Sequence, residues 1–346
     1  MAPEKNATGD PSSTVLRDMI TGGWTSQAIY VAARLGIAEL LAEGPRKCEE
    51  LATSIGAHSG SLYRLMRGLT SLGLCTEASD GMFELTSLGS HLRAGVAGSV
   101  RSWALLWGGS LWPIWGTLLH SVRTGERLRP LSTGPEGFDN LAQRPEAAKV
   151  FDMAMVEITA LVAETVVGAY DFSRIGRIVD VGGGYGELLV AILRAYPTLQ
   201  GVLFELPHVV EGARKHIEAA GVAERCEAVP GNFFESVPIG AGAYLLKSII
   251  HDWNDDRSLV VLRNCHHAIT SEGKLLIIER ILPERIQPCL EHRMIAASDL
   301  NMLVATTGRE RTGAEYRSLL GAAGFKVTRT VPIGGYFSVI EAERAV

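Results

Sequence analysis

The stretch IVDVGGGYGELL, residues 178–189, decides the fold that the sequence predicts. It opens with a short apolar run typical of a buried strand and closes with an apolar helical pattern that starts at Glu187. Four glycines separate the two halves. Because glycine carries no side chain, the backbone here can approach a ligand closely, beside the positive end of the following helix. The stretch therefore predicts a strand, a ligand-binding turn and a helix.

Strand and helix patterns alternate on the C-terminal side of this stretch. Further apolar runs typical of strands occupy residues 201–206, 226–230, 243–248 and 274–280. Such alternation predicts an α/β fold, in which a parallel sheet has helices on both faces. The end of the chain differs, because residues 325–342 are predicted to form two strands joined by a turn at residues 332–335. This terminal hairpin makes the last strand antiparallel to the rest.

The N-terminal side of the chain has a mostly helical pattern, and we assign residues 15–98 to one module. A short helix is expected over residues 48–55, closed by Gly56, and apolar residues recur at helical spacing within residues 61–72. Asp80-Gly81 then lies between two strand-like runs, which is a strong signal for a hairpin. Two helices followed by a hairpin predict a winged-helix module.

The charge of this module argues against binding to DNA. Residues 48–93 hold three basic residues against five acidic ones, and the whole chain has a net charge of -5 at pH 7. Binding to phosphates needs clustered positive charge. We therefore expect the module to serve packing or dimerisation and expect no nucleic-acid partner. A winged-helix regulator that senses a small ligand stays as the alternative from another functional class.

The composition is that of a globular protein, with 47% hydrophobic and 21% charged residues. The five cysteines are scattered and form no CxxC pair, which predicts neither a disulfide framework nor a metal site. Residues 1–14 are polar, lack the apolar stretch of a signal peptide and are expected to be disordered. No apolar run approaches the ~18 residues of a membrane span. We expect a cytoplasmic protein without a membrane partner or a bound metal.

The residues around the glycines indicate the kind of ligand. A dinucleotide site would need the pattern GxGxxG, which this turn does not contain. Asp180 lies before the turn and Glu187 after it, and Glu205 ends the next strand. A carboxylate at such a strand end can accept hydrogen bonds from both ribose hydroxyls of a nucleoside. These residues fit an adenosine-type cofactor without phosphates, such as S-adenosylmethionine (SAM), whose cationic sulfonium is tolerated beside carboxylates.

The stretch KSIIHDWNDD, residues 247–256, closely resembles the small-molecule O-methyltransferases of plant and bacterial secondary metabolism, of the caffeate/flavonoid and antibiotic-pathway types. The resemblance covers nearly the whole chain. It implies a Rossmann-like class I methyltransferase sheet over residues 169–346, with SAM as cofactor and S-adenosylhomocysteine as its product. It also implies that residues 99–168 are linking helices that contribute to the acceptor pocket and the dimer. The subunits are expected to form a homodimer through the N-terminal module.

The resemblance assigns the parts of the cofactor to particular residues. The glycine turn holds the amino-acid end of SAM in that family, and Glu205 matches the acid that binds the ribose, where Asp is commoner. Asn232 replaces the acid that accepts from the adenine amino group, and Phe233 matches the residue that packs on the adenine face. Lys247 matches the residue that reaches the methionine end. The implied cofactor-binding residues are Asp180, Gly182, Gly184, Gly186, Glu205, Leu206, Asn232, Phe233, Lys247 and Ser248.

On the acceptor side, His251 resembles the catalytic base of the family, with Asp252 beside it and with Glu279 and Glu310 as the flanking acids. A phenol has a pKa near 10 and needs a base at pH 7. Histidine, with an ordinary pKa of about 6.5, is expected to be largely neutral and able to take the proton. A carboxylate on its other nitrogen fixes the tautomer. The residues implied to contact the acceptor are Trp107, Phe151, Met155, Asp299, Met302 and Leu303.

Simpler roles for these residues remain open. Asp252 or Asn254 can serve as the cap of the helix that follows, and Glu279 and Glu310 can be ordinary salt-bridge partners. The residues implied to contact the acceptor can equally be core residues. The sequence predicts transfer of the SAM methyl group to a hydroxyl of a small aromatic, phenolic acceptor. The alternatives within the fold are N- or C-methylation, or a family member repurposed for a non-methylating reaction.

Overall fold

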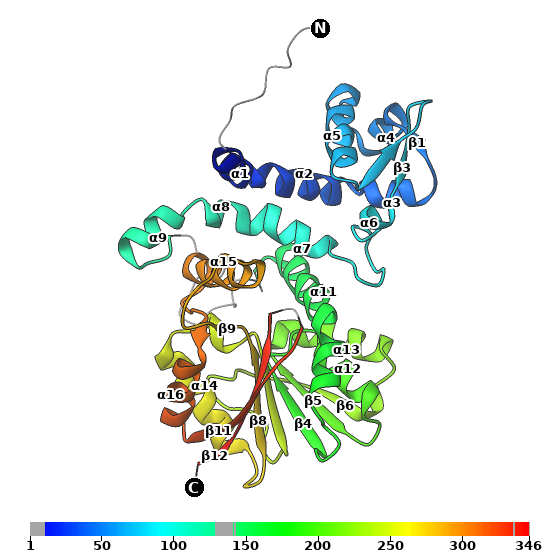
Figure 1. Cartoon of the computed structure of the whole chain (residues 1–346). Coiled ribbons are helices and arrows are strands. Elements are labelled where there is room, and N and C mark those ends of the chain that lie inside the picture. Colours follow the sequence, from blue (N-terminus) through cyan, green and yellow to red (C-terminus); the bar gives the residue numbers. More distant parts are fainter. Residues whose placement is uncertain (1–10, 129–140, 142, 335, 346) are drawn as a thin grey trace. The chain divides into compact units, whose positions relative to one another are not determined.

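The computed structural model describes residues 11–128, 141, 143–334 and 336–345 (Figure 1). The chain divides into two compact units, Met1–Gly109 and Ser110–Val346. The boundary falls inside the segment 99–168 that was expected to link the two domains. Each unit has its own buried core, described below.

The N-terminal unit is mostly helical. Its core gathers fully buried side chains such as Leu51, Met66 and Phe83. Its small antiparallel sheet has the strand order β1-β3-β2. The elements are α1 (Pro11–Ile20), α2 (Gly22–Leu35), α3 (Ile37–Ala42), β1 (Arg46–Lys47), α4 (Cys48–Ile55), α5 (Ser59–Ser71), β2 (Cys75–Glu77), β3 (Met82–Leu85), α6 (Ser87–Ser90) and α7 (Arg101–Leu105).

Several local predictions for this unit are confirmed. Helix α4 has the predicted bounds, and Gly56 ends it in the left-handed conformation with φ 67°. Strands β2 and β3 form the predicted hairpin around Asp80-Gly81. The winged-helix label stays a prediction. Helix α1 begins at Pro11, so residues 11–14 are helical where a disordered tail was expected, and residues 1–10 lie outside the described residues.

The C-terminal unit is built on a seven-stranded sheet with the order β11-β12-β8-β7-β4-β5-β6. Its strands β8, β7, β4, β5 and β6 are parallel, and β12 runs antiparallel to β8 and β11. This confirms the parallel sheet and the terminal hairpin, whose turn includes Gly335, a residue outside the described ones. The strands are β4 (Arg177–Val181), β5 (Gln200–Glu205), β6 (Cys226–Pro230), β7 (Ala243–Lys247), β8 (Lys274–Glu279), β11 (Phe325–Pro332) and β12 (Ser338–Arg344).

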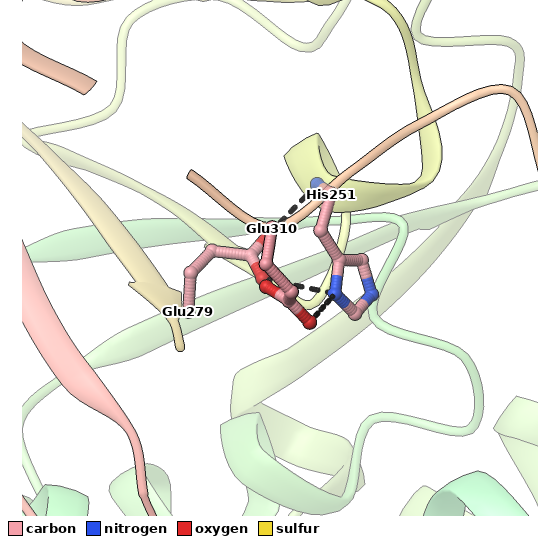
Figure 2. Close-up of side chains that lie close together, drawn as sticks. All are labelled: His251, Glu279 and Glu310. Atoms are coloured by element: carbon pink, nitrogen blue, oxygen red, sulfur yellow. Dashed lines mark hydrogen bonds and ion pairs between the residues drawn. The ribbon is translucent and has the colours of Figure 1, made fainter. Parts of the chain in front are cut away.

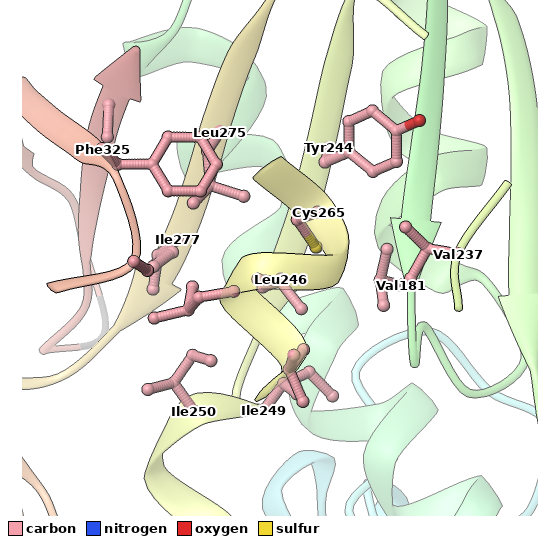
Figure 3. Close-up of a cluster of buried hydrophobic side chains, with 14 of the residues drawn as sticks. Val181, Val237, Tyr244, Leu246, Ile249, Ile250, Cys265, Leu275, Ile277 and Phe325 are labelled. Atoms are coloured by element: carbon pink, nitrogen blue, oxygen red, sulfur yellow. The ribbon is translucent and has the colours of Figure 1, made fainter. Parts of the chain in front are cut away.

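Helices cover both faces of this sheet (Figure 1). Alternate residues of β7 face opposite sides, with Leu245 packed toward α12 and Tyr244 and Leu246 toward α14 and α16. Figure 3 shows the hydrophobic core on the side of α14 and α16, to which Cys265 and Phe325 also contribute. The helices are α8 (Leu111–Trp115), α9 (Leu118–Thr124), α11 (Pro145–Ala169), α12 (Glu187–Ala195), α13 (Pro207–Ala219), α14 (Asp255–Ala268), α15 (Leu290–Ala305) and α16 (Gly313–Ala322).

Shorter elements complete the chain. A π-helical turn, η1 (Leu106–Ser110), and two 3-10 turns, η2 (Ala223–Arg225) and η3 (Ile250–Asp252), join the longer elements. Strands β9 (Ile281–Leu282) and β10 (Arg311–Thr312) pair in parallel. None of the described helices combines the length and the apolar character that a membrane crossing requires. All five cysteines are free thiols, and only Cys289 is exposed.

Candidate active site

The glycine turn between β4 and α12 has a backbone that other residues adopt only with strain. Gly182, Gly184 and Gly186 have φ values of 72°, 60° and 83°. The turn is also tightly packed, because a Cβ on Gly182 would lie 2.7 Å from Cδ1 of Ile249, and one on Gly183 would lie 2.3 Å from Asp180 Oδ2. The glycines therefore allow both the left-handed turn and its close approach to neighbouring residues.

The predicted ribose acid, Glu205, lies at the end of β5 and is hydrogen-bonded to the turn. Its Oε2 accepts from the amide of Gly184 at 3.0 Å, and its Oε1 accepts from the amide of Leu206 at 2.7 Å. Burial raises the pKa of Glu205 to about 7. Burial, together with the charge of Glu205, also raises the pKa of Asp180 to about 7. The structure therefore brings both predicted acids to the turn, and a cationic ligand would favour their charged forms.

Lys247 and Ser248 lie at the end of β7, beside the same turn. Lys247 Nζ donates to Thr159 Oγ1 at 3.0 Å, and burial lowers the pKa of Lys247 to about 8. Ser248 has a φ of 55°, which is rare for a residue other than glycine. Its amide donates to the carbonyl of Ile278 at 3.1 Å, which holds the strained residue on the sheet. Strain of this kind is concentrated at functional sites.

Asn232 and Phe233 occupy the turn after β6. The side-chain oxygen of Asn232 accepts from the amide of Phe234 at 3.0 Å, so this oxygen supports the turn itself. The ring of Phe233 packs on Phe234 with a centroid distance of 4.7 Å, and Asn264 donates to the Phe233 carbonyl. Whether Asn232 also accepts from adenine stays a prediction.

His251 is the centre of the acceptor side, and its ring is held by two buried glutamates (Figure 2). Nδ1 lies 3.0 Å from Oε1 of Glu310 and 3.4 Å from Oε2 of Glu279. Nε2 lies 3.8 Å from Oδ1 of Asp252, which is too long for a hydrogen bond. The two glutamates therefore fix the ring through one nitrogen, as the resemblance implied.

Each glutamate is held in place by the surrounding chain. Glu279 ends β8, and its Oε1 accepts from the backbone amides of Ile249, Ile250 and His251 at 2.9–3.3 Å. Glu310 Oε1 accepts from the hydroxyl of Ser298 at 2.6 Å. Both side chains are more than simple surface salt-bridge partners, because they are almost completely buried.

The three acids change the charge of the histidine. Burial opposes a charged ring, but Glu279, Glu310 and Asp252 together raise the pKa of His251 to about 10. The positive ring in turn holds the pKa of Glu310 below its ordinary value, against the effect of burial. The acidic neighbours therefore favour the charged form of the ring, whereas the sequence led us to expect a largely neutral histidine at pH 7.

The geometry shows which residue, Asp252 or Asn254, caps the helix that follows His251. Asn254 is the residue that caps α14, since its side chain accepts from the amide of Arg257. Asp252 lies in the 3-10 turn that precedes it, beside His251, and burial raises the pKa of Asp252 to about 7. Asp252 is thus a neighbour of the histidine and not the cap.

Two residues that the sequence analysis missed support the His251 segment. Arg311 is 1% exposed and donates to the carbonyls of Ile250 and Trp253 at 2.9 and 2.8 Å. Gly308 lies against the same backbone, and a Cβ there would lie 1.8 Å from the carbonyl oxygen of His251. Both residues lie within three positions of Glu310 in the sequence. A glycine and an arginine so close to a predicted site residue were the signal that could have pointed to them.

The residues implied to contact the acceptor lie in both units. Asp299 Oδ1 accepts from the amide of Glu310 at 2.9 Å, so it also supports that glutamate. Met302 is buried on α15, while Phe151 and Met155 are half-buried on α11. Leu303 is half-buried. Trp107 belongs to the N-terminal unit, with its ring 5.5 Å from that of Trp103. Their contacts with an acceptor stay predictions.

Among the described residues, one group of side chains has the spacing of a possible metal site. The ligand atoms of His251, Glu279 and Glu310 lie within 4.8 Å of one another. Both carboxylates face the same ring nitrogen, Nδ1, at 3.4 Å from Glu279 and 3.0 Å from Glu310. The prediction of a metal-free site stays a prediction.

Comparison with known proteins decides the family. A family model for an O-methyltransferase domain matches residues 115–326, and one for an O-methyltransferase dimerisation domain matches residues 18–94. The chain belongs to the O-methyltransferase family. This enzyme is 42% identical to the phenazine O-methyltransferase PhzM of Lysobacter antibioticus, over 99% of both chains. It is also 33% identical to the phenazine-1-carboxylate N-methyltransferase of Pseudomonas aeruginosa, over 95% of this chain and 97% of that one.

Solved structures agree with this assignment. A crystal structure of an O-methyltransferase from neocarzinostatin biosynthesis, in complex with SAM and 2-hydroxy-5-methyl naphthoic acid, has a TM-score of 0.78 and 34% identity. The match covers 92% of this chain and 96% of that one. The enzyme is a SAM-dependent O-methyltransferase with the class I fold. The expected cofactor and family are thereby confirmed, and the dimerisation model supports a homodimer.

Proposed function

We propose that this O-methyltransferase methylates a phenolic hydroxyl of a small aromatic natural product, with His251 as general base. Bound SAM supplies the methyl group as an electrophile. The observation that carries the proposal is the buried His251 ring, whose Nδ1 is held 3.0 Å from Glu310 Oε1. A histidine oriented by a carboxylate is suited to accept a proton through its other nitrogen.

The orientation of the ring supports Nε2 as the nitrogen that accepts the proton. Nδ1 faces both glutamates, while the carboxylate nearest to Nε2, that of Asp252, lies 3.8 Å away. When His251 is neutral, its hydrogen stays on Nδ1 between the carboxylates, and the lone pair of Nε2 is free to accept. The acceptor hydroxyl is expected at Nε2.

The raised pKa of His251 matches the proton affinity of a phenol. A phenol has an ordinary pKa near 10, and the pKa of His251 is raised to about 10 by its acidic neighbours. In a complex that has lost one proton, the remaining proton can therefore reside on His251, which leaves a phenolate as the nucleophile. Because the acids favour the charged form of His251, the rate should rise with pH above neutrality.

N-methylation is the alternative that the relatives raise, since one of them is named an N-methyltransferase and another an N,N-dimethyltransferase. A neutral aromatic amine needs no base before the methyl group arrives, because its lone pair is already available. The three acids gathered at His251 would then serve no purpose in the methyl transfer. Their arrangement favours oxygen as the acceptor atom.

We also propose that the homodimer forms through an apolar face of α1 and α2. In the single chain, several large apolar side chains of these helices are exposed, among them Trp24 at 75%. The dimerisation model matches the segment that contains it. Covering such a face with a second copy removes apolar surface from water, which favours association. The exposed apolar residues on the two helices are Val15, Leu16, Met19, Ile20 and Trp24.

The test of the base is His251→Asn, compared with His267→Asn as a matched control. His267 is exposed on α14. We expect His251→Asn to lower kcat/KM for a phenolic acceptor by about 10²- to 10⁴-fold at pH 7.5, with little change in the Kd for SAM. The control should leave both unchanged. A His251→Asn enzyme that keeps its full rate would instead indicate catalysis by proximity alone.

A further inference from the structure

Thr159 on α11 is hydrogen-bonded to the side chain of Lys247, although 88 residues separate the two in the sequence. Thr159 was not among the predicted site residues. We propose that Thr159 is a positioning residue, which holds the Lys247 ammonium where it binds the carboxylate at the amino-acid end of SAM. The inference rests on the proposed function, in which SAM bound at the glycine turn is the methyl donor.

The position of Lys247 in the sheet brings it to the crevice where a ligand is expected. The strands that follow β4 lie on both sides of it, with β5 and β6 on one side and β7 and β8 on the other. In such sheets, ligands bind at the carboxyl ends of the strands where the order reverses, which is here between β4 and β7. Asp180 of β4 is paired with Leu245 of β7, so Lys247, two residues further along, lies level with Gly182 at the start of the glycine turn.

The ammonium of Lys247 has donors to offer to a ligand. Nζ donates to Oγ1 of Thr159 at 3.0 Å, and among the described residues no carboxylate lies within 4 Å of Nζ and no second acceptor is hydrogen-bonded to it. An ammonium carries three donors, and two of them are therefore unpaired in the described part of the chain. A carboxylate is the ligand group that pairs best with such donors, because it adds an opposite charge to the hydrogen bond.

Two contacts fix the direction in which the ammonium points. Thr159 is buried on α11, so the position of its hydroxyl is set by the packing of the helix. The ring centroid of Phe337, which is also buried, lies 5.5 Å from Nζ, within the range of a cation–π contact. A lysine side chain loses much rotamer freedom when it is held. Fixing it before the ligand arrives therefore lowers the cost of binding.

The charges around the turn explain why a fixed cation is needed there. Asp180, Asp252 and Glu279 are near enough to Lys247 for their charges to favour its ammonium form. Acids of this kind suit the cationic sulfonium of SAM but repel the carboxylate of the same ligand. Lys247 offsets this repulsion at the end of β7, and Thr159 keeps it directed toward the ligand.

Thr159→Val tests the inference because it removes the hydroxyl and keeps the branched shape of the side chain. Two ligands are compared, S-adenosylhomocysteine and 5′-methylthioadenosine, which keeps the adenosine and the thioether but lacks the amino-acid end. We expect Thr159→Val to raise the Kd for S-adenosylhomocysteine, measured by calorimetry at pH 7.5, by about threefold to tenfold. The Kd for 5′-methylthioadenosine should stay unchanged. Thr159→Ser keeps a hydroxyl and should bind both ligands as the native protein does.

Two further variants complete the comparison. Thr165→Val is the matched control, because Thr165 lies on the same helix and its hydroxyl donates to the carbonyl of Val162 at 2.7 Å. It should change neither Kd. Lys247→Met removes the ammonium itself and should weaken S-adenosylhomocysteine at least as much as Thr159→Val does. Adding Thr159→Val to Lys247→Met should cause little further loss, because the hydroxyl acts through the ammonium.

Two results would overturn the inference. Unchanged affinity for S-adenosylhomocysteine in Thr159→Val would show that the hydroxyl does not position the ammonium, and an equal loss for both ligands would show a general structural role. Lys247→Met distinguishes these failures from failure of the proposed cofactor seat. If Lys247→Met binds S-adenosylhomocysteine normally and keeps the native unfolding temperature, the cofactor does not reach Lys247 and the seat itself is wrong.

Discussion

Replacing Glu310 by glutamine removes one charge beside His251 and keeps the shape of the side chain. Glu310 Oε1 lies 3.0 Å from Nδ1, and the amide oxygen of glutamine can still accept that hydrogen. An opposite charge at this range shifts a pKa by ~1 to 3 units, which corresponds to ~1.4 to 4 kcal/mol between the two protonation states. We therefore expect the pKa of His251 to fall from about 10 to ~7 to 9.

The sign of the kinetic effect follows from the resting charge. If His251 is the base, the activity of the native enzyme is expected to rise with pH as His251 loses its proton. A lower pKa of His251 then moves this acid limb of the pH profile toward lower pH. The pH profile of kcat/KM for a phenolic acceptor at saturating SAM measures the shift, which should be ~1 to 3 units. At high pH the variant should be slower, because its histidine is a weaker base.

The control is Glu211→Gln, which changes an exposed glutamate paired with Lys215 on α13. This control should leave the acid limb of the kcat/KM pH profile at the same pH. An acid limb that stays at the same pH in Glu310→Gln would refute the reasoning, because it would show that another group sets the profile.

Three further predictions follow from the structure. Gly308→Ala places a Cβ 1.8 Å from the His251 carbonyl, so we expect a loss of about 1 to 3 kcal/mol in the free energy of unfolding, with lower kcat, measured by urea unfolding and kinetics. Asp180 has a pKa raised to about 7 by burial, so its charged form destabilises the ligand-free fold increasingly as pH rises from about 4 to 7. The unfolding temperature of Asp180→Asn relative to the native protein should therefore rise from pH 5 to pH 8, and a constant difference would contradict this. Trp24→Ser should weaken the homodimer in light scattering at low micromolar concentration, and an unchanged mass would exclude this face of α2.

Much of the sheet could be predicted because its signals are local. The apolar run at residues 226–230 became β6 with the expected bounds, and the stretch that begins at residue 178 formed the expected strand, turn and helix as β4, the glycines and α12. Alternation of strands with helices predicts parallel pairing. The start of α1 at Pro11 was missed, because a polar, proline-containing segment resembles a tail.

The active site could be predicted only in part. The resemblance to a family brought His251, Glu279 and Glu310 together, although Glu310 is 59 residues from the histidine. The charge of the ring depends on how closely three acids converge, which no local pattern reveals. The burial of Arg311 and the contact of Tyr185 with Gly212 likewise arise from tertiary packing. The spacing of residues along the chain predicts neither the burial of Arg311 nor this contact.

The most direct test of the central claim is to identify the atom that receives the methyl group. The acceptor 3-amino-4-hydroxybenzoate, which is named in a relative from Streptomyces cremeus that is 35% identical to this chain, offers nitrogen and oxygen on one ring. A panel of it and of hydroxylated phenazines and naphthoates would be incubated with trideuteromethyl-labelled SAM, and the products analysed by mass spectrometry and NMR. We expect a labelled methyl ether from at least one phenol, and we expect this product to be lost in His251→Asn. Label on nitrogen or carbon only, or an ether formed equally well without His251, would contradict it.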